Sequence, residues 1–458
     1  MKTINYLLFF LLIIILSSFS GKKQKQPFKE GEFKEWAQRP PMGWNSWDCY
    51  GPTVEEREVK ANADYMAKYL KQFGWQYIVV DIRWFVENDK AGGYNQKDPR
   101  FVIDEYGRYM PALNRFPSAK DGKGFKELAD YIHQKGLKFG IHIMRGIPAI
   151  AVTRKLPVKG GGGVTADQIY STENQCKWLS DNYTIVADKP GSQEYYNSIF
   201  ELYAEWGVDF VKVDDLSAPI YHRDEIEMIR KAIDKSGRPM VLSTSPGETP
   251  IGDADHVSRH ANMWRMVNDV WDSWWHISHL MEVSRKWYPF IKAGTWPDCD
   301  MIPLGRLSIR GEVGENRMTR LTKDEQYTLM TFFTIFHSPL FFGGDLPGND
   351  EFTLSLLTNK EVLRMHSESS DVRLLYQKDG MVAVTSKNKK TGESYLALFN
   401  ISENSPLELK VNLADVGLDG DVRVTNLWTG KDAGIFKDSF AQDFAAHASG
   451  LFKLVRTK

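Results

Sequence analysis

The chain has 458 residues, with 58 Lys and Arg against 59 Asp and Glu, so its formal net charge is -1. This balance gives no electrostatic reason to expect nucleic acid or an anionic membrane as a partner. Hydrophobic residues make up 42% of the chain, which is ordinary globular composition. The length is typical of two or three domains.

The N-terminus predicts an export signal. Lys2 supplies a positive charge, residues 6–16 form an unbroken apolar run, and Ser18-Phe19-Ser20 offers small residues for cleavage. The run is too short to span a bilayer, and no Cys follows it to carry a lipid anchor. We therefore expect a signal peptide over residues 1–20, a loosely extended leader over 21–37, and a periplasmic or extracellular protein without a membrane anchor.

The three cysteines, Cys49, Cys176 and Cys299, cannot all pair within one chain, and their spacing matches no zinc pattern. We expect free, buried thiols. His256 and His260 are four residues apart, but no Glu follows His256 directly. We interpret both as loop or core histidines and predict no metal.

Short apolar runs alternate with amphipathic stretches from residue 41 to about 345. The runs that predict strands are 42–47, 77–81, 137–143, 209–214, 240–243, 262–266, 290–294 and a segment around 334–342. Helix patterns between them include 54–73, 124–135, 194–206 and 224–235. This alternation predicts an α/β fold, a (β/α)8 TIM barrel over residues 38–365. An open doubly wound sheet is the alternative, but no glycine-rich phosphate loop follows the first strand.

The pattern changes after residue 366. Strand-like segments at 381–387, 394–400, 407–411, 421–428 and 450–455 are separated by turns, without a helix of useful length. A C-terminal antiparallel β-sandwich over residues 366–458 is therefore expected, with no catalytic residues in it.

Polar residues close several barrel strands, at the end where barrel active sites lie. Asp81, His142, Asp214 and Asp269 each follow an apolar run. Two carboxylates on one rim suit glycoside cleavage, in which one attacks the anomeric carbon and the other protonates the leaving oxygen. Lys212 shares a strand face with Asp214 and would keep it ionised. A lyase or aldolase using Lys212 as a Schiff-base nucleophile is an alternative, although a carboxylate two residues away favours the charged lysine.

Residues 40–47 read PPMGWNSW and resemble the opening strand of glycoside hydrolase family 27, the family of α-galactosidases, α-N-acetylgalactosaminidases and β-L-arabinopyranosidases. Further matches follow in the expected order at residues 74–84, 136–141, 206–214, 264–269 and 298–301. The resemblance covers residues 38 to 345 and extends to the sandwich.

The resemblance implies a retaining exo-glycosidase that releases a terminal α-D-galactose from an oligosaccharide or a polysaccharide side chain. It implies Asp214 as the nucleophile and Asp269 as the acid/base, and it implies no metal or organic cofactor. The implied sugar contacts are stacking by Trp47, hydroxyl binding by Asp81 and Lys212, contacts near O2 by Arg265, and a supporting acid, Asp300.

Three departures from the family pattern bear on the substrate. Ile82 replaces the second of two adjacent acids that read the 4- and 6-hydroxyls of galactose, His142 stands where Tyr is common, and Ser245 lies where Glu and Trp are typical. A site without a hydrogen-bonding partner loses discrimination for that hydroxyl. A β-L-arabinopyranoside, which lacks the hydroxymethyl group of galactose, is therefore an alternative substrate. A substituted galactoside and a non-catalytic carbohydrate-binding protein are further alternatives.

Overall fold

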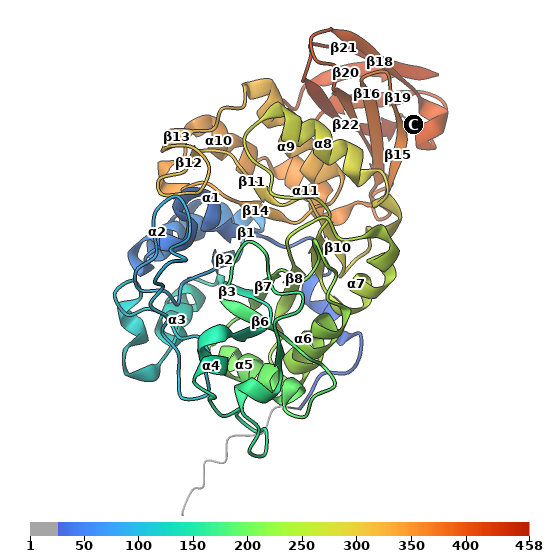
Figure 1. Cartoon of the computed structure of the whole chain (residues 1–458). Helices are drawn as coiled ribbons and strands as arrows, with labels where there is room; N and C mark the ends of the chain where they lie inside the picture. The colour runs from blue at the N-terminus through green and yellow to red at the C-terminus, as the bar shows by residue number, and fades with distance from the viewer. Residues whose placement is uncertain (1–25, 458) are drawn as a thin grey trace, which may run out of the picture.

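The computed structural model describes residues 26–457 (Figure 1). The predicted signal peptide, residues 1–20, lies outside this range, so export stays a prediction from the sequence. Within the described range, no helix combines the length and the apolar character that a membrane span requires.

Eight parallel strands form the central barrel. They are β1 (Met42–Asn45), β2 (Tyr77–Val80), β3 (Lys138–Met144), β7 (Phe210–Asp214), β8 (Val241–Thr244), β9 (Met263–Arg265), β10 (Trp296–Asp298) and β14 (Leu340–Phe342). Their hydrogen-bonded order is β10-β9-β8-β7-β3-β2-β1-β14-β11. β11 (Met301–Ile302) continues the segment that begins with β10, so this segment pairs with β9 at one end and with β14 at the other, which closes the ring. The predicted (β/α)8 TIM barrel is confirmed.

Helices on the outside connect the strands: α2 (Glu56–Tyr65), α3 (Lys126–Gln134), α5 (Ser192–Trp206), α6 (Arg223–Ser236), α7 (Ala254–His260), α8 (Trp274–Ser284) and α9 (Lys323–Ile335). The four helices predicted from the sequence are present. One predicted strand is wrong, since residues 288–290 form a 3-10 turn and the seventh strand begins only at Trp296. The first residues of the segment predicted around 334–342 end α9, and the strand starts at Leu340.

The lower interior of the barrel is filled by aromatic side chains. The rings of Tyr77, Phe210 and Phe341 contact one another with centroids 5.0–6.3 Å apart. Gly43 and Gly140 provide the room, because a Cβ at Gly43 would come within 2.7 Å of Tyr77 Cβ and one at Gly140 within 3.0 Å of Phe210 Cβ. Side chains alternate along a strand. Two residues above Phe210, the interior therefore becomes polar, starting with Lys212 and followed by Asp214.

The end of the predicted leader is folded rather than loose. Residues Glu32–Ala37 form a 3-10 helix that buries Phe33 and Ala37. The Phe33 carbonyl accepts a hydrogen bond from Asn262 Nδ2 (2.9 Å), and the Ala37 carbonyl accepts one from Trp296 Nε1 (2.8 Å). Since Asn262 and Trp296 lie at the starts of β9 and β10, this short helix covers the bottom of the barrel.

The C-terminal part is the predicted antiparallel sandwich, seen at the upper right of Figure 1. One sheet has the order β15-β16-β17-β22-β19-β20 and the other is β18-β21. Their bounds are β15 (Ser370–Lys378), β16 (Met381–Lys387), β17 (Ser394–Asn400), β18 (Leu407–Asn412), β19 (Val422–Asn426), β20 (Asp432–Phe436), β21 (Ser439–Phe444) and β22 (Ser449–Arg456). β15, β20 and β21 were missed by the sequence analysis.

The central strands β16 and β17 of the larger sandwich sheet are buried on both faces. On β17, Leu396 and Leu398 face the second sheet, whereas Ala397 and Phe399 belong to the core that continues into the barrel. The barrel partner is α9, where Phe332 meets Phe399 with ring centroids 5.9 Å apart. Trp428 Nε1 also donates to Thr331 Oγ1 on α9 (2.8 Å). The sandwich is thus packed directly on the helix before β14.

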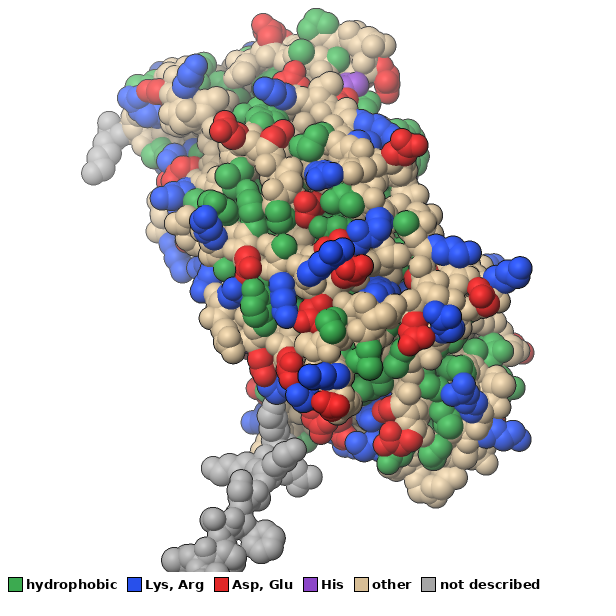
Figure 2. Space-filling view, turned by 90° about the vertical axis from the view of Figure 1, so that its left-hand side faces the viewer, with side chains coloured by type: hydrophobic (Ala, Val, Ile, Leu, Met, Phe, Trp, Pro, Cys, Tyr) green, Lys and Arg blue, Asp and Glu red, His purple; other side chains and the backbone are tan. Residues whose placement is uncertain are grey.

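All three cysteines are free, as predicted, with Cys49 and Cys299 buried and Cys176 half-buried. The face of the molecule in Figure 2 carries Lys and Arg interspersed with Asp and Glu, without a continuous region of one sign. This distribution agrees with the near-zero net charge.

Candidate active site

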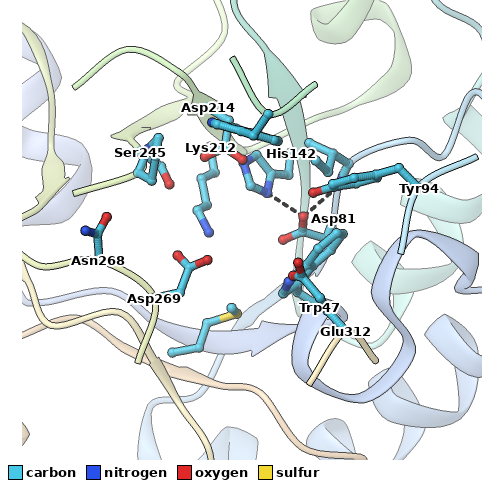
Figure 3. A pocket seen from close by; sticks show the side chains of 14 residues that line it. Trp47, Asp81, Tyr94, His142, Lys212, Asp214, Ser245, Asn268, Asp269 and Glu312 are labelled. Carbon is cyan, nitrogen blue, oxygen red and sulfur yellow. Dashed lines mark hydrogen bonds and ion pairs between the residues drawn. The ribbon is translucent and has the colours of Figure 1, made fainter. Parts of the chain in front are cut away.

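A cavity of about 530 Å³ opens at the carboxyl ends of the strands (Figure 3). Its walls are Trp47, Asp81, Ile82, Tyr94, His142, Trp178, Lys212, Asp214, Ser245, Pro246, Asn268, Asp269, Met301 and Glu312. Eight of the ten residues singled out in the sequence analysis are in this set. The other two, Arg265 and Asp300, lie behind the wall and contact Asp269 and its loop.

His142 is held between two carboxylates. Its Nδ1 is 2.7 Å from Asp81 Oδ1 and its Nε2 is 3.1 Å from Asp214 Oδ2, both at ion-pair distance (Figure 3). Burial lowers the pKa of His142, but the charges of Asp214 and Asp81 outweigh it, so the net pKa is raised. The imidazolium therefore positions both acids at once. A tyrosine at this position could not supply that positive charge.

Asp214 is buried at the end of β7 and remains ionised because cations surround it. Burial alone would raise its pKa, but His142 and Lys212 hold the pKa well below its ordinary value. Lys212 extends into the cavity between Asp81 and Asp269 (Figure 3) and forms no ion pair within residues 26–457. Burial lowers the pKa of Lys212, but the charges of Asp81 and Asp214 outweigh this effect. The net pKa is raised, so the amine stays protonated. A protonated amine can donate to a sugar hydroxyl but cannot form a Schiff base.

Asp269 stands across the cavity from Asp214, on the loop after β9 (Figure 3). Its side chain is 59% exposed, and Oδ1 accepts a hydrogen bond from Arg265 Nη2 at 3.0 Å. Arg265 also pairs with Asp300 through Nη1 (2.6 Å), and Asp300 Oδ2 accepts from the Val270 backbone N–H (2.8 Å). Arg265 and Asp300 therefore fix the loop that carries Asp269.

Asp300 is a buried acid in a strained backbone position, with φ 82°. Burial, together with the charge of Asp269, raises its pKa to about 7, while Arg265 acts in the opposite direction. It lies in the short break between β10 and β11.

Ile82 is 1% exposed and lines the cavity directly after Asp81. Its own N–H donates to Asp81 Oδ1 at 2.7 Å, and the Asp81 N–H donates to Ser46 Oγ at 3.0 Å. Asp81 is therefore oriented toward His142 and the cavity, whereas the neighbouring side chain offers only apolar surface. A sugar hydroxyl beside Ile82 would find no hydrogen-bond acceptor on that side chain.

Three aromatic side chains form one wall of the cavity. Trp47 lies against Tyr94 with ring centroids 5.7 Å apart, and Tyr94 stacks on Trp178 at 6.1 Å. Glu312, in the loop between β12 (Arg306–Leu307) and β13 (Arg317–Met318), stands near Trp47 at the cavity mouth (Figure 3). Burial raises the pKa of Glu312, with Asp269 adding to the rise.

Six of the lining residues were missed by the sequence analysis: Tyr94, Trp178, Pro246, Asn268, Met301 and Glu312. Most of them come from loops, which carry no periodic pattern. For Tyr94 and Trp178, an aromatic residue inside an otherwise polar stretch was the available signal.

Two family models match this chain: the alpha galactosidase A model over residues 175–368 and the alpha galactosidase C-terminal beta sandwich domain over 379–454. A solved β-L-arabinopyranosidase of Geobacillus stearothermophilus, itself of glycoside hydrolase family 27, is 50% identical. The match covers 93% of this chain and 98% of that one, with a TM-score of 0.91. The chain belongs to glycoside hydrolase family 27.

Other family 27 relatives extend the comparison. A solved chain from Bacillus halodurans, described as a putative α-N-acetylgalactosaminidase, is 46% identical over 91% of this chain and 97% of its own, with a TM-score of 0.83. The alpha-galactosidase A of Cellvibrio japonicus is 28% identical over 75% of this chain and 71% of its own length. This family 27 protein is a glycoside hydrolase that acts on carbohydrate.

Proposed function

We propose that this family 27 enzyme is a retaining β-L-arabinopyranosidase. The observation that supports this most directly is Ile82, buried in the cavity wall beside Asp81. L-Arabinopyranose is galactose without the hydroxymethyl group, so it places no hydroxyl against this apolar side chain. A hydroxyl buried without a partner costs about 1–3 kcal/mol, which disfavours galactose. The solved relative at 50% identity is described as a β-L-arabinopyranosidase, and a variant of it is described in complex with arabinose.

In the proposed reaction, the Asp214 carboxylate attacks the anomeric carbon while Asp269 gives its proton to the departing glycosidic oxygen. This step breaks the glycosidic bond and forms an ester between Asp214 and the sugar. Asp269, now ionised, takes a proton from a water molecule that attacks the same carbon and releases Asp214. Two inversions retain the configuration of the anomeric carbon.

The neighbours of the two acids support this assignment. Asp214 is kept ionised by His142 and Lys212, as a nucleophile must be. Asp269 is exposed and held by Arg265, where it can exchange protons with solvent. Lys212 and Asp81 offer a donor and an acceptor to hydroxyls at the bottom of the cavity, and Trp47 offers an apolar face to the ring.

Hydrolysis of an α-D-galactoside is the second candidate. Asp81, Lys212 and Trp47 would serve either sugar, since the two differ only at the substituent on C5. The arabinopyranoside is favoured over it because of Ile82.

The proposal is tested with aryl β-L-arabinopyranoside, α-D-galactoside and α-N-acetylgalactosaminide. We expect the highest kcat/KM for the arabinopyranoside. Ile82→Asp should raise the ratio of galactoside to arabinopyranoside kcat/KM by about 10–100-fold, because it adds an acceptor for the 6-hydroxyl. Ile82→Val, which keeps the wall apolar, is the matched control and should leave the ratio close to that of the native enzyme. A native preference for the galactoside would reject the proposal.

A further inference from the structure

A cluster of two histidines and a glutamate lies on the outside of the barrel, away from the catalytic cavity. His256 and His260 are one turn apart on α7, and Glu227 is on the neighbouring helix α6 (Figure 1). One ligand atom from each of the three residues lies within 4.8 Å of the other two. None of these residues lines the catalytic cavity.

The geometry of this cluster is that of a partly assembled metal site. His256 Nε2 is 3.3 Å from Glu227 Oε1. Two ligands of a tetrahedral zinc ion, each bound at about 2.0–2.1 Å, are separated by about 3.3–3.4 Å. These two atoms are hydrogen-bonded to each other, and a shared ion would replace the proton between them at this same separation. The His260 ring lies beside that of His256, with ring centroids 4.3 Å apart and the planes tilted by 33°.

The outer nitrogen of each histidine is held by a hydrogen-bonding group. His260 Nδ1 is 2.8 Å from the carbonyl oxygen of His256, and His256 Nδ1 is 2.7 Å from the hydroxyl of Tyr221. Since a carbonyl can only accept, His260 Nδ1 carries the proton and its Nε2 keeps the free lone pair. Histidines that bind a metal in proteins usually donate their second N–H in this way, which fixes the ring orientation.

The cluster is also open to an incoming ion. Glu227 and His260 line a surface cavity of about 450 Å³ between α6 and the segment that begins near Pro27. Four cationic side chains also line this cavity: Arg230, Lys231, Lys235 and Arg259. Of these, Lys231 forms an ion pair with Glu227, with Nζ 3.8 Å from Oε2, and its side chain is 66% exposed. The ammonium can turn away into solvent when an ion arrives.

We propose that Glu227, His256 and His260 bind a divalent transition-metal ion of the zinc type, with solvent at the fourth position. Two imidazoles and one carboxylate suit zinc better than the oxygen-preferring ions calcium and magnesium. Because α6 follows the nucleophile strand β7 and α7 follows β8, the ion would join two adjacent βα units. Its role would be to stabilise the barrel rather than to take part in hydrolysis.

The test is calorimetric titration of the untagged, chelator-treated and desalted enzyme with zinc chloride. We expect one ion per chain, and at least about tenfold weaker binding for His260→Ala and for Glu227→Gln, each of which removes one ligand. His279→Ala is the matched control, because His279 is a half-exposed histidine on α8 outside the cluster, and it should bind zinc as the native enzyme does.

A second measurement gives an independent outcome. Zinc should raise the Tm of the native enzyme and of His279→Ala, but not that of His260→Ala, because an ion that binds only the folded state stabilises it. Glu227→Gln has almost the same shape as the native side chain, so it tests the site even if His260→Ala folds poorly. Absence of saturable binding, or equal affinity of the native enzyme and Glu227→Gln, would overturn the proposal.

Discussion

The two sides of the catalytic cavity are built differently. The Asp214 side chain is 11% exposed and lies at the end of a barrel strand, in contact with His142. The Asp269 side chain is 59% exposed and lies on a loop, held by Arg265. A nucleophile has to be placed within a fraction of an ångström and kept ionised, whereas an acid/base has to exchange protons with water in every cycle. In the proposed mechanism, two identical side chains therefore receive different tasks from their surroundings.

The largest loss of activity is expected for a change at Asp214, on the barrel strand. Asp214→Asn removes the proposed nucleophile and should lower kcat by about 10⁴-fold or more, since loss of a nucleophile leaves only the binding and electrostatic contributions. Steady-state rates with an aryl arabinopyranoside and an aryl galactoside measure this. Asp224→Asn, an exposed change on α6, is the control for the loss of one negative charge. Native activity in Asp214→Asn would show that the nucleophile is elsewhere.

For a change at Asp269, on the exposed loop, the loss of activity should depend on the leaving group. Asp269→Asn should reduce kcat/KM by about 10²–10⁴-fold for substrates whose leaving oxygen needs a proton. An activated dinitrophenyl glycoside needs no proton on departure, so its glycosylation step should be affected far less. Added azide should restore turnover by attacking the ester without base assistance. An equal loss with both substrates would contradict the acid role.

His142 lies between Asp81 and Asp214. Replacing it with an uncharged side chain tests the effect of its positive charge. His142→Gln should move the acidic limb of the kcat/KM profile upward by about one pH unit, because Asp214 loses the cation that keeps its pKa low. The rate at low pH should fall by about tenfold. His133→Gln, at a histidine outside the cavity, should leave the profile in place. An unchanged acidic limb in His142→Gln would mean that Lys212 alone keeps Asp214 ionised.

The smallest effect concerns the stability of the same group of residues. The lowered pKa of Asp214 contributes stability above its ordinary value of 3.8, and this contribution is lost as pH falls through the folded pKa. The raised pKa of His142 contributes stability that is full below about pH 6.5 and is lost as pH rises through the folded pKa. A tenfold change in proton affinity on folding corresponds to about 1.4 kcal/mol of unfolding free energy. Urea unfolding across this range should therefore show an alkaline decline that is weaker in His142→Gln.

Much of the barrel could be predicted because its strands are short apolar runs with helical patterns between them. The seventh strand could not, since its sequence is Trp296-Pro297-Asp298 and a proline normally argues against a strand. The run just before it, residues 290–294, was predicted as the strand, but Phe290 ends a 3-10 turn and the rest of the run does not continue as a strand. In this case the tertiary position between β9 and β14, rather than local propensity, decides the structure.

Strand periodicity predicted that the residues on β7 would lie together in the site, but it did not predict the aromatic wall of the cavity. Lys212 and Asp214 share one face of β7, so the strand alone brings them together. Tyr94, Trp178 and Glu312 come from separate loops whose paths depend on contacts far along the chain. The placement of Arg265 behind Asp269 also required the structure, because the sequence does not show that Asp300 would pair with it.

The stacking between the sandwich and the barrel has a consequence for how the enzyme unfolds. The ring of His447 stacks on that of Trp274, the first residue of α8, with ring centroids 3.8 Å apart. His447 Nδ1 is also 2.8 Å from Glu325 Oε1 at the start of α9. Trp274 follows the Asp269 loop by only a few residues. Because the sandwich contacts α8 and α9 directly, we expect it to unfold together with the barrel. Heat or denaturant should melt both parts in a single transition, and a gene truncated before β15 should yield an insoluble barrel.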